Sequence, residues 1–428
     1  MHQTFDIDIK HLSKIEGHTD LNIKVKNGKV EDVKLKIMEN KRFYTQAIRG
    51  KPFMSVPQIV SRICGTCSVA HLTCCIEAVE KALKINPSEQ TMLLRKLNMY
   101  GTMIRDHAMH LYLFCLPDLF KKDSILDFDE SNETQHKLVH QAFAVKSAGN
   151  HLSTLIGGRA IHSPFEQIGG FSNIPDKDGV RKMIFELKKI RNEIFDLIQL
   201  FYECDWKFGE KTNFVALVTR DFSFLEGVIK DTEGETIPES RYWDHLNRVV
   251  IPYSQASGFQ FEGKEYMVGA LARMNLNKKS LHKDTRRDTI KFLKVFPSEN
   301  VYHNNLAQAI EILHCIDHSI ELLEMSEFKE EKIPALKIKA GDGIGVIEAP
   351  RGTLYYMISL TKDGKINYGN LIIPTAQNQI KMERDIKALV PQYLKKGKER
   401  VRLEIEKLIR AYDPCTTCAS HFLKIRWI

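Results

Sequence analysis

Hydrophobic and polar residues alternate through residues 5–40, and this period of two is typical of strands with one buried face. The segment LNIKVKNGKVEDVKLKI places Asn27-Gly28 between two alternating runs. Both residue types tolerate the positive φ angles of a two-residue turn, so the pair predicts a β-hairpin. We therefore expect a β-rich N-terminal part over about residues 1–45.

Two later parts of the chain also carry strand patterns. Residues 334–374 alternate again, and within them residues 353–360 and 365–373 predict two strands joined through Asp363-Gly364. Residues 208–282 hold shorter alternating runs, turn signals and aromatic side chains. We interpret this stretch as a mixed, β-containing excursion that lies outside the main core of the protein.

That core is predicted to be helical, because apolar residues recur every three or four positions through most of the remaining chain. The predicted helices are too apolar to be surrounded by water, which favours a bundle of long helices. The pattern therefore indicates a mainly helical α+β fold with peripheral hairpins and small sheets. Helices are expected at residues 68–83, 88–116, 134–157, 178–205, 304–326 and about 378–412, the last interrupted at Pro391 and Gly397.

Composition and charge exclude several classes of protein. The chain has 428 residues, of which 43% are hydrophobic and 27% charged, as in ordinary globular proteins. Its net charge of +8 is spread along the chain, and we interpret the densest basic run, residues 394–402, as a solvated helix face. This argues against nucleic acid as a partner.

No apolar run reaches the roughly 18 residues of a membrane span, and the N-terminus lacks the apolar core of a signal peptide. Nine cysteines in a chain of this length do not resemble a secreted disulfide framework. We expect a cytoplasmic protein with some cysteines held as metal ligands. Five others fall in apolar helical patterns and are expected to be buried structural thiols: Cys74, Cys75, Cys115, Cys204 and Cys315.

The candidate chemistry lies in two C-x-x-C pairs, one in RICGTC (62–67) and one in DPCTTCASH (413–421). Two intervening residues allow both sulfurs of a pair to reach one metal. Asp413-Pro414 predicts a helix start, with Asp as N-cap and Pro at the first helical position. Cys415 would then lie at a helix N-terminus, which favours a thiolate. We expect the fold to bring both pairs into one four-thiolate site, within a single interlocked domain spanning residues 1–428.

Spacing alone leaves several interpretations of these pairs open. Structural zinc favours four-cysteine sites, but its pairs usually lie closer than the 347 residues that separate Cys67 from Cys415. A redox or catalytic metal buried in a large core is equally compatible with the pattern. A thioredoxin-like redox pair would need a βαβ context, which neither pair has.

The residues around the cysteines resemble the large subunit of the [NiFe]-hydrogenases. Both cysteine motifs, together with IEGH, RDHAMHLY, EAPRG and IIPTAQN, appear in the order expected for that family. GRAIHSPFEQIGGF and NNLAQAIEILH most resemble its soluble cytoplasmic, NAD(P)-linked branch, which includes the sulfhydrogenase α subunits. The resemblance covers essentially the whole chain and implies the [NiFe]-hydrogenase large-subunit fold and reversible H2 oxidation.

The resemblance also implies a ligand set. Cys64 and Cys415 would be terminal thiolates on nickel, and Cys67 and Cys418 would bridge nickel to an iron that carries CN and CO ligands. Soft thiolates suit such a centre because they stabilise several nickel oxidation states. Cys415 would be the first proton acceptor.

Glu16, in IEGH, would carry the proton onward, since burial near a metal–thiolate core raises a carboxyl pKa toward a range useful for transfer. Arg351, in EAPRG, would point its guanidinium over the open position, paired with or oriented by Asp106 and Asp413. Without the resemblance, Glu16 would be an ordinary residue at the start of a strand. P-R-G would equally well be a surface turn.

Smaller roles follow for the residues that line the pocket. Pro350 fixes the turn before Arg351, and Pro374 and Thr375 would line the same pocket, with Thr375 donating a hydrogen bond to cyanide. His107 and His110 are expected to be helix-packed, hydrogen-bonded histidines rather than ligands.

His421 would bind a second divalent ion, usually magnesium, with the Leu371 carbonyl as another ligand. Thr45 stands where the family usually has a Glu, and a hydroxyl cannot replace the anionic oxygen that magnesium prefers. The magnesium site is therefore expected to be weakened or absent.

The Gly-rich segment GDGIG (341–345) is interpreted as a turn rather than a dinucleotide site, because no helix follows it. No cysteine set remains for iron–sulfur clusters, so electrons would leave through an iron–sulfur small subunit and diaphorase-type electron-transfer subunits. The alternatives are a H2-sensing regulatory hydrogenase, and a structural or electron-transfer-complex subunit with a four-cysteine zinc site or no metal.

Overall fold

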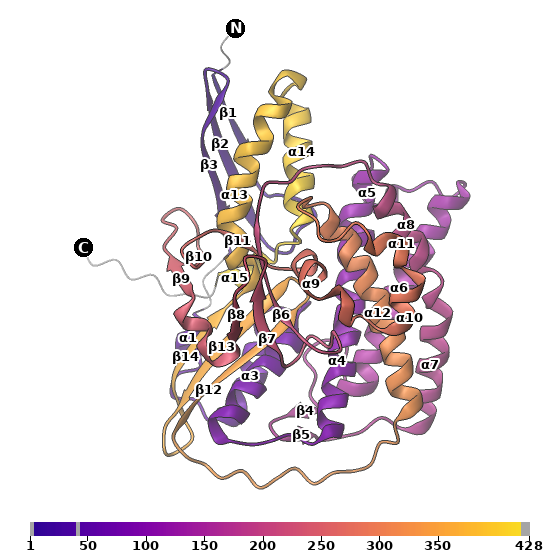
Figure 1. Cartoon of the computed structure of the whole chain (residues 1–428), viewed down its shortest axis with the longest axis vertical. Helices are drawn as coiled ribbons and strands as arrows, with labels where there is room; N and C mark the ends of the chain where they lie inside the picture. Colours follow the sequence, from indigo (N-terminus) through magenta and orange to yellow (C-terminus); the bar gives the residue numbers. More distant parts are fainter. Residues whose placement is uncertain (1–3, 40–42, 421–428) are drawn as a thin grey trace, which may run out of the picture.

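The computed structural model of the chain describes residues 4–39 and 43–420. Long helices form one side of the molecule, as Figure 1 shows, with α12 packed against α4, α7 and α8 and with α6 packed against α4 and α7. A π-helical segment, Met109–Cys115, continues α4 into the short helix α5. The bundle helices are α4 (Glu89–Ala108), α5 (Leu116–Leu119), α6 (Glu133–Gly157), α7 (Lys177–Arg191), α8 (Ile194–Glu203) and α12 (His303–Met325).

Two antiparallel three-stranded sheets lie beside this bundle (Figure 1). The first, in the order β1-β2-β3, packs through β3 on α13, and the second, in the order β12-β13-β14, packs on α3. Their elements are β1 (Phe5–Ile9), β2 (Thr19–Lys26), β3 (Lys29–Ile37), α3 (Ser68–Leu83), β12 (Gly341–Ala349), β13 (Gly352–Leu360), β14 (Ile366–Ile372) and α13 (Pro374–Tyr393).

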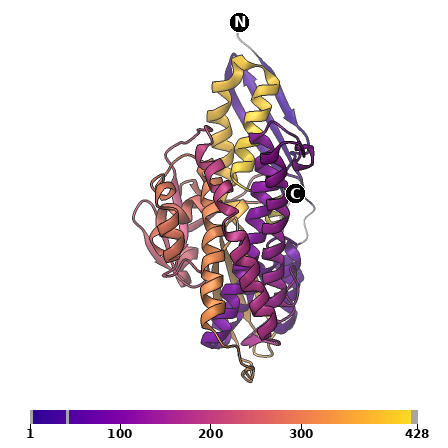
Figure 2. The ribbon, with the colours of Figure 1, turned by 90° about the vertical axis from the view of Figure 1, so that its right-hand side faces the viewer.

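The region predicted as a mixed excursion lies to one side of the long helices in Figure 2. It contains a sheet in the order β11-β6-β7-β8 and the pair β9–β10. Its elements are β6 (Asn213–Val218), β7 (Val228–Asp231), β8 (Thr236–Pro238), β9 (Leu246–Val249), β10 (Gly258–Phe261), β11 (Tyr266–Met267) and α9 (Ala270–Asn277). The remaining elements are α1 (Tyr44–Ala47), α2 (Val56–Val60), β4 (Glu166–Gln167), β5 (Gly170–Phe171), α10 (Lys283–Asp288), α11 (Ile290–Leu293), α14 (Lys398–Ala411) and α15 (Thr416–Ala419).

Several local predictions are confirmed. Asn27 and Gly28 form the turn between β2 and β3 with φ angles of 51° and 75°. The mainly helical α+β class is also correct, as are the two strands joined through Asp363-Gly364. Pro391 lies in the last turn of α13, and the chain breaks before α14 at Gly397, whose φ is +91°.

Other local predictions are wrong in detail. Residues 178–205 form two helices rather than one, because α7 ends at Arg191 and α8 begins at Ile194. Cys204 is only partly buried, since it follows the end of α8, whereas Cys74, Cys75, Cys115 and Cys315 are buried as expected.

The glycines of GDGIG form the start of β12 rather than a turn. The reason is a close approach of α3 to that strand. A Cβ added to Gly343 would lie 1.9 Å from the Ala78 carbonyl oxygen, and one added to Gly345 would lie 2.2 Å from the Cys74 carbonyl oxygen. Alternate glycines therefore give the helix a flat face on which to lie.

Gly343→Ala is expected to lower the free energy of unfolding by about 3 kcal/mol, because the overpacked methyl group meets helix backbone that cannot move aside. Chemical denaturation measures this. Gly170→Ala is the control, since a Cβ at Gly170 would make ordinary contacts at 3.4 and 3.8 Å. Equal stability of the two variants would contradict the packing argument.

Segments from both ends of the chain are joined by side-chain hydrogen bonds. Gln379 Nε2 donates to the Leu35 carbonyl at 3.0 Å, and the Leu35 amide donates to Glu383 Oε1 at 2.8 Å. The N-terminal sheet is thereby fixed to α13. We propose that residues 1–428 fold as one interlocked unit.

Across the described ranges, no helix is both long enough and apolar enough to cross a bilayer.

Candidate metal centre

The two cysteine pairs meet in the interior of the protein. The Sγ atoms of Cys64 and Cys415 lie 3.5 Å apart, those of Cys67 and Cys418 lie 3.3 Å apart, and those of Cys415 and Cys418 lie 2.8 Å apart. All four Sγ atoms lie within 4.8 Å of one another. The four side chains are 1–5% exposed, so the cluster is closed to bulk water.

Short local structures present the four sulfurs. Cys64 is extended after a 3₁₀ turn, and Cys67 is the N-cap of α3. Cys415 is the N-cap of the four-residue helix α15, and Cys418 lies inside that helix. Each pair therefore spans the junction between an irregular segment and a helix, where the backbone can direct two sulfurs toward one point.

The N-terminal segment holds the second pair in place. Glu16 and Cys415 form a parallel β-bridge, and the Thr416 amide donates to the Glu16 carbonyl at 2.8 Å. Gly17 allows this approach, because a Cβ there would lie 2.4 Å from Thr416 Oγ1. Residue 16 is thus fixed beside the cysteine cluster by backbone contacts.

Asp413 does not begin the final helix as predicted. Its φ is +49°, its amide bonds to the Arg410 carbonyl at the end of α14, and α15 begins only at Thr416. The carboxylate cannot cap α15 because it is turned toward Arg351. Cys415 is consequently the N-cap residue itself, and Thr375 Oγ1 accepts a hydrogen bond from its amide at 2.8 Å.

Burial raises the pKa of the Cys415 and Cys418 thiols well above the usual value. The predicted stabilisation of a Cys415 thiolate by a helix N-terminus is therefore smaller than the opposing effect of burial on the pKa of Cys415. Four adjacent buried sulfurs cannot all lose their protons without a cation among them. A soft, multivalent metal would displace those protons, which fits the donor set.

Arg351 occupies the two-residue turn between β12 and β13. Its Nη1 donates to Asp106 Oδ2 at 2.8 Å, and its Nη2 lies 3.2 Å from Asp413 Oδ1. Burial alone would lower the pKa of Arg351, but the two carboxylates raise it well above its usual value, so the guanidinium remains charged. We call these three buried residues the arginine cluster.

The arginine cluster faces the cysteines and has one unused donor. Negative charge on Cys415 or Cys67 would also raise the pKa of Arg351, so the guanidinium is electrostatically coupled to both pairs. Among the described residues, the buried Arg351 Nε has no hydrogen-bond partner. A buried donor without a partner costs free energy, and an anionic ligand in the pocket would satisfy it.

Glu16 is half-buried, and its backbone is paired with Cys415 of the cluster. Burial raises the pKa of its carboxyl, and the negative charge of Cys64 raises it further. Arg351 acts in the opposite direction. The carboxyl is thus electrostatically coupled to both the cysteines and the arginine cluster.

The other predicted site residues lie as follows. His107 Nε2 is 2.9 Å from Glu311 Oε2, and His110 Nδ1 is 2.6 Å from Gln308 Oε1, so both histidines are packed and hydrogen-bonded. Pro350 is the first residue of the Arg351 turn, and Pro374 is the buried first residue of α13.

The proposed second ion site is only partly described. Leu371 is buried in β14, and Thr45 lies in the short helix α1. His421, the third residue of this prediction, lies outside the described residues.

Sequence reasoning missed Arg105, which precedes Asp106 on α4. Its guanidinium donates to the carbonyl of Thr66, between the first two cysteines, and to the carbonyl of Ala160. It is 4% exposed. The RDHAMHLY motif contains this residue, but the motif alone does not distinguish a buried arginine from an exposed one.

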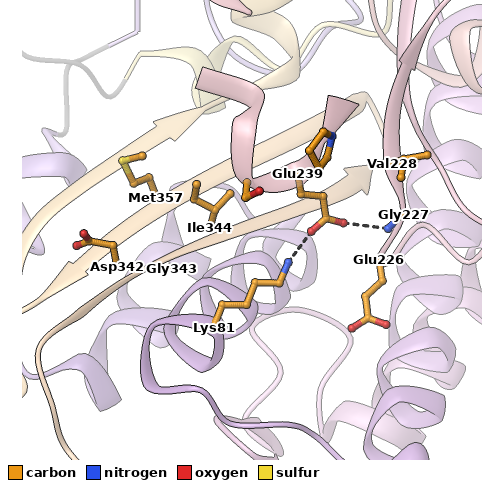
Figure 3. Close-up of a pocket in the computed structure, with 11 residues that line it drawn as sticks. Lys81, Glu226, Gly227, Val228, Glu239, Asp342, Gly343, Ile344 and Met357 are labelled. Atoms are coloured by element: carbon orange, nitrogen blue, oxygen red, sulfur yellow. Dashed lines mark hydrogen bonds and ion pairs between the residues drawn. The ribbon is translucent and has the colours of Figure 1, made fainter. Parts of the chain in front are cut away.

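A surface cavity and a second group of possible metal ligands lie outside this site. Figure 3 shows a surface cavity of about 550 Å³ near the C-terminal end of α3, where Lys81 contacts Glu239. No cysteine or histidine lines it. A second group, Glu130, His136 and His140, is exposed near the start of α6.

Comparisons with known proteins identify relatives of this chain. A sequence model of the family described as "Nickel-dependent hydrogenase" matches residues 42–147 and 225–421. The chain is 32% identical to Sulfhydrogenase 1 subunit alpha of Pyrococcus furiosus over 98% of each protein. It is 27% identical to the NAD-reducing hydrogenase HoxS subunit beta of Cupriavidus necator, over 97% of this chain and 94% of that protein.

A solved structure gives the same result for the fold. A chain of an NAD+-reducing [NiFe]-hydrogenase in the H2-reduced state superposes with a TM-score of 0.86. The match covers 97% of this chain and 99% of that one, at 24% identity. The predicted large-subunit fold is therefore confirmed.

Proposed function

This chain belongs to the nickel-dependent hydrogenase family, and on that premise we propose that its four buried thiolates hold a nickel–iron centre. The protein is the catalytic subunit of a hydrogenase. The observation that carries the assignment of the centre is the convergence of four Sγ atoms, from both ends of the chain, within 4.8 Å of one another. When bound, such a centre would supply the oxidation of H2, which yields two protons and two electrons.

We assign Cys64 and Cys415 as terminal ligands of nickel, and Cys67 and Cys418 as ligands shared with an iron that carries CN and CO. All four Sγ atoms lie within 4.8 Å of one another, which supports one shared centre, and the division into terminal and shared ligands follows from the resemblance to the family. Thr375 accepts the Cys415 amide hydrogen bond, which leaves its own hydroxyl hydrogen free to donate. Pro350 and Pro374 are proposed to line the same pocket.

Glu16 is proposed to carry protons from Cys415 to the surface. Its backbone is bonded to residues 415 and 416, its side chain is half-buried, and its raised pKa favours a carboxyl that binds and releases protons closer to neutral pH. Glu39 interacts electrostatically with Glu16, and its Oε1 accepts a hydrogen bond from the amide of exposed His18 at 2.7 Å.

Arg351 is proposed to stabilise negative charge in the open pocket beside the thiolates. Arg351→Lys should lower the H2-oxidation rate by about 100-fold, because lysine cannot reproduce the bidentate fork that fixes the charge between Asp106 and Asp413. Nickel per chain should not change. H2-dependent dye reduction and metal analysis measure the two effects, and an unchanged rate would remove Arg351 from the mechanism.

A weak or missing magnesium site is proposed near Leu371 and His421. Thr45 offers only a neutral oxygen at the position where the family usually supplies a carboxylate.

Electrons must leave through other subunits. Within the described residues, which include all nine cysteines, the four of the cluster are the only cysteines grouped as metal ligands. We therefore propose an iron–sulfur small subunit, docked near exposed Arg62 and Gly65 beside the first cysteine pair. The name of the relative from Cupriavidus necator, an NAD-reducing hydrogenase, supports NAD as the final acceptor, and we propose that electrons reach it through diaphorase-type subunits. None of the nine cysteines, all of which lie in the described residues, forms a disulfide, which supports our proposal of a cytoplasmic location.

Metal analysis combined with infrared spectroscopy tests the proposed centre. The purified complex should contain nickel, iron in excess of its iron–sulfur clusters, and infrared bands of CN and CO. A complex with one zinc per chain, no nickel and no such bands would overturn the assignment in favour of a structural four-cysteine site.

A further inference from the structure

Helix α12 carries three buried polar side chains on one face. Asn304, Gln308 and Glu311 are spaced by four and three residues, so they lie above one another along the helix. Their exposed fractions are 2%, 0% and 0%. They belong to the NNLAQAIEILH motif, which has no role in the mechanism described above.

Gln308 contacts the arginine cluster directly. Its Nε2 donates to Asp413 Oδ2 at 2.9 Å, and its Oε1 lies 2.6 Å from His110 Nδ1. His110 in turn bonds through Nε2 to the Arg410 carbonyl at 2.8 Å. The amide therefore fixes both the Asp413 carboxylate and the chain that leads to it.

Glu311 contacts both sides of the Arg351–Asp106 ion pair through neighbouring residues. Its carboxylate accepts from Arg273 Nε and Nη2, each at 2.7 Å, and its Oε2 lies 2.9 Å from His107 Nε2. His107 directly follows Asp106 on α4. One carboxylate thus ties α4 to the arginine of α9.

Arg273 extends this contact to the turn that carries Arg351. Its Nη1 donates to the Ala349 carbonyl at 3.1 Å, and its Nη2 donates to the Pro350 carbonyl at 3.0 Å. These are the two carbonyls immediately before Arg351. Arg273 also bonds to Glu348 at 2.8 Å, so the turn is held from the strand and from the helix.

Asn304 holds the remaining segment. Its Oδ1 accepts from the Leu271 amide at 2.8 Å, and its Nδ2 donates to the Ala411 carbonyl at 2.9 Å. It therefore links α9 to the last residue of α14, two positions before Asp413.

We propose that the Asn304–Gln308–Glu311 face of α12 is the positioning element of the arginine cluster. Each member of the cluster comes from a different part of the chain, and this one face contacts all three parts. A single rigid helix can then set the distances among Asp106, Arg351 and Asp413, as supporting hydrogen bonds do for other catalytic groups. The inference rests on the proposed function of Arg351.

A double-mutant cycle tests the proposal with the complete enzyme complex. Gln308→Met keeps the size of the side chain but removes both hydrogen bonds, and we expect it to lower the H2-oxidation rate about tenfold with nickel retained. In the Arg351→Lys background, Gln308→Met should not lower the H2-oxidation rate further, because the arginine that Gln308 positions is already absent.

His314→Met is the matched control. His314 lies six residues beyond Gln308 on α12 and is fully buried. It also makes two hydrogen bonds, with the His282 amide and the Phe222 carbonyl at 2.9 and 3.1 Å. Neither partner belongs to the arginine cluster. Its effect on the rate should therefore be the same factor in the wild-type and Arg351→Lys backgrounds.

An equal loss from Gln308→Met in both backgrounds would overturn the proposal, since Gln308 would then act independently of the arginine. Gln308→Glu, which opposes Asp413 with a like charge, provides a second variant should the methionine protein fail to accumulate. Loss of nickel from both Gln308 variants, with nickel retained in His314→Met, would also overturn it. Full activity of Arg351→Lys alone would instead refute the proposed role of Arg351 and the inference with it.

Discussion

Replacing Cys415 with alanine is expected to yield a folded subunit that retains no nickel. Cys415 Sγ lies 3.5 Å from Cys64 Sγ and 2.8 Å from Cys418 Sγ, so it is in direct contact with two other sulfurs of the cluster. A methyl group offers no lone pair to a metal, and the three remaining sulfurs cannot complete the ligand set. Nickel should fall from about one per chain to less than about a tenth, because metal binding requires the deprotonated ligands of the site.

The same measurement on Cys315→Ala distinguishes metal loss from general damage. Cys315 is a fully buried thiol on α12, outside the cluster. Its replacement by alanine makes the same chemical change, from a buried thiol to a methyl group. Both variants should show similar small losses in thermal stability, but only Cys415→Ala should lose nickel and H2 oxidation. Full nickel in purified Cys415→Ala would show that this sulfur is not a ligand.

The local part of this structure could be predicted from the sequence. Asn27-Gly28 determines its own turn through backbone preference, and the 3.6-residue period of the long helices is set by side chains a few positions apart. The meeting of the cysteine pairs is different, since 347 residues lie between them and their spacing alone also allows zinc. The meeting was expected from the two pairs, but the choice of a nickel–iron centre over zinc depended on the order of motifs along the whole chain.

The predictions that failed were those in which a distant partner overrides a local preference. Asp413-Pro414 has the composition of a helix start, but Arg351 and Gln308 draw the Asp413 carboxylate away from the cap position. The glycines at 341–345 have the composition of a turn, yet they form a strand because α3 lies against it. Neither partner can be identified from nearby residues.

Buried polar residues in an apolar helix were a usable signal that sequence reasoning left unexplained. In NNLAQAIEILH, Asn304, Gln308 and Glu311 interrupt the apolar face of α12 at helical spacing. A polar side chain at a core position must find a partner, because an unsatisfied buried group costs about 1–3 kcal/mol. The pattern thus predicts that partners exist but not which ones.

Glu16→Gln is expected to retain both metals while lowering the rate of H2/D+ exchange by about 1,000-fold, within the range for loss of a general acid–base group. Glutamine has nearly the same shape, and the contacts that hold residue 16 beside Cys415 are made by its backbone. The fold and the ligands should therefore persist. An amide cannot take up and release a proton, so only the transfer step is removed.

Glu383→Gln is the control for this effect. Glu383 is also half-buried, and burial raises the pKa of its carboxyl to about 7, but it bonds to Tyr253 and to the Leu35 amide on the N-terminal sheet. If any carboxyl with a raised pKa could serve the reaction, both variants would slow exchange. If the position of the carboxyl beside the cysteines is what matters, only Glu16→Gln will slow exchange. Unchanged exchange in Glu16→Gln would show that protons leave the thiolates by another route.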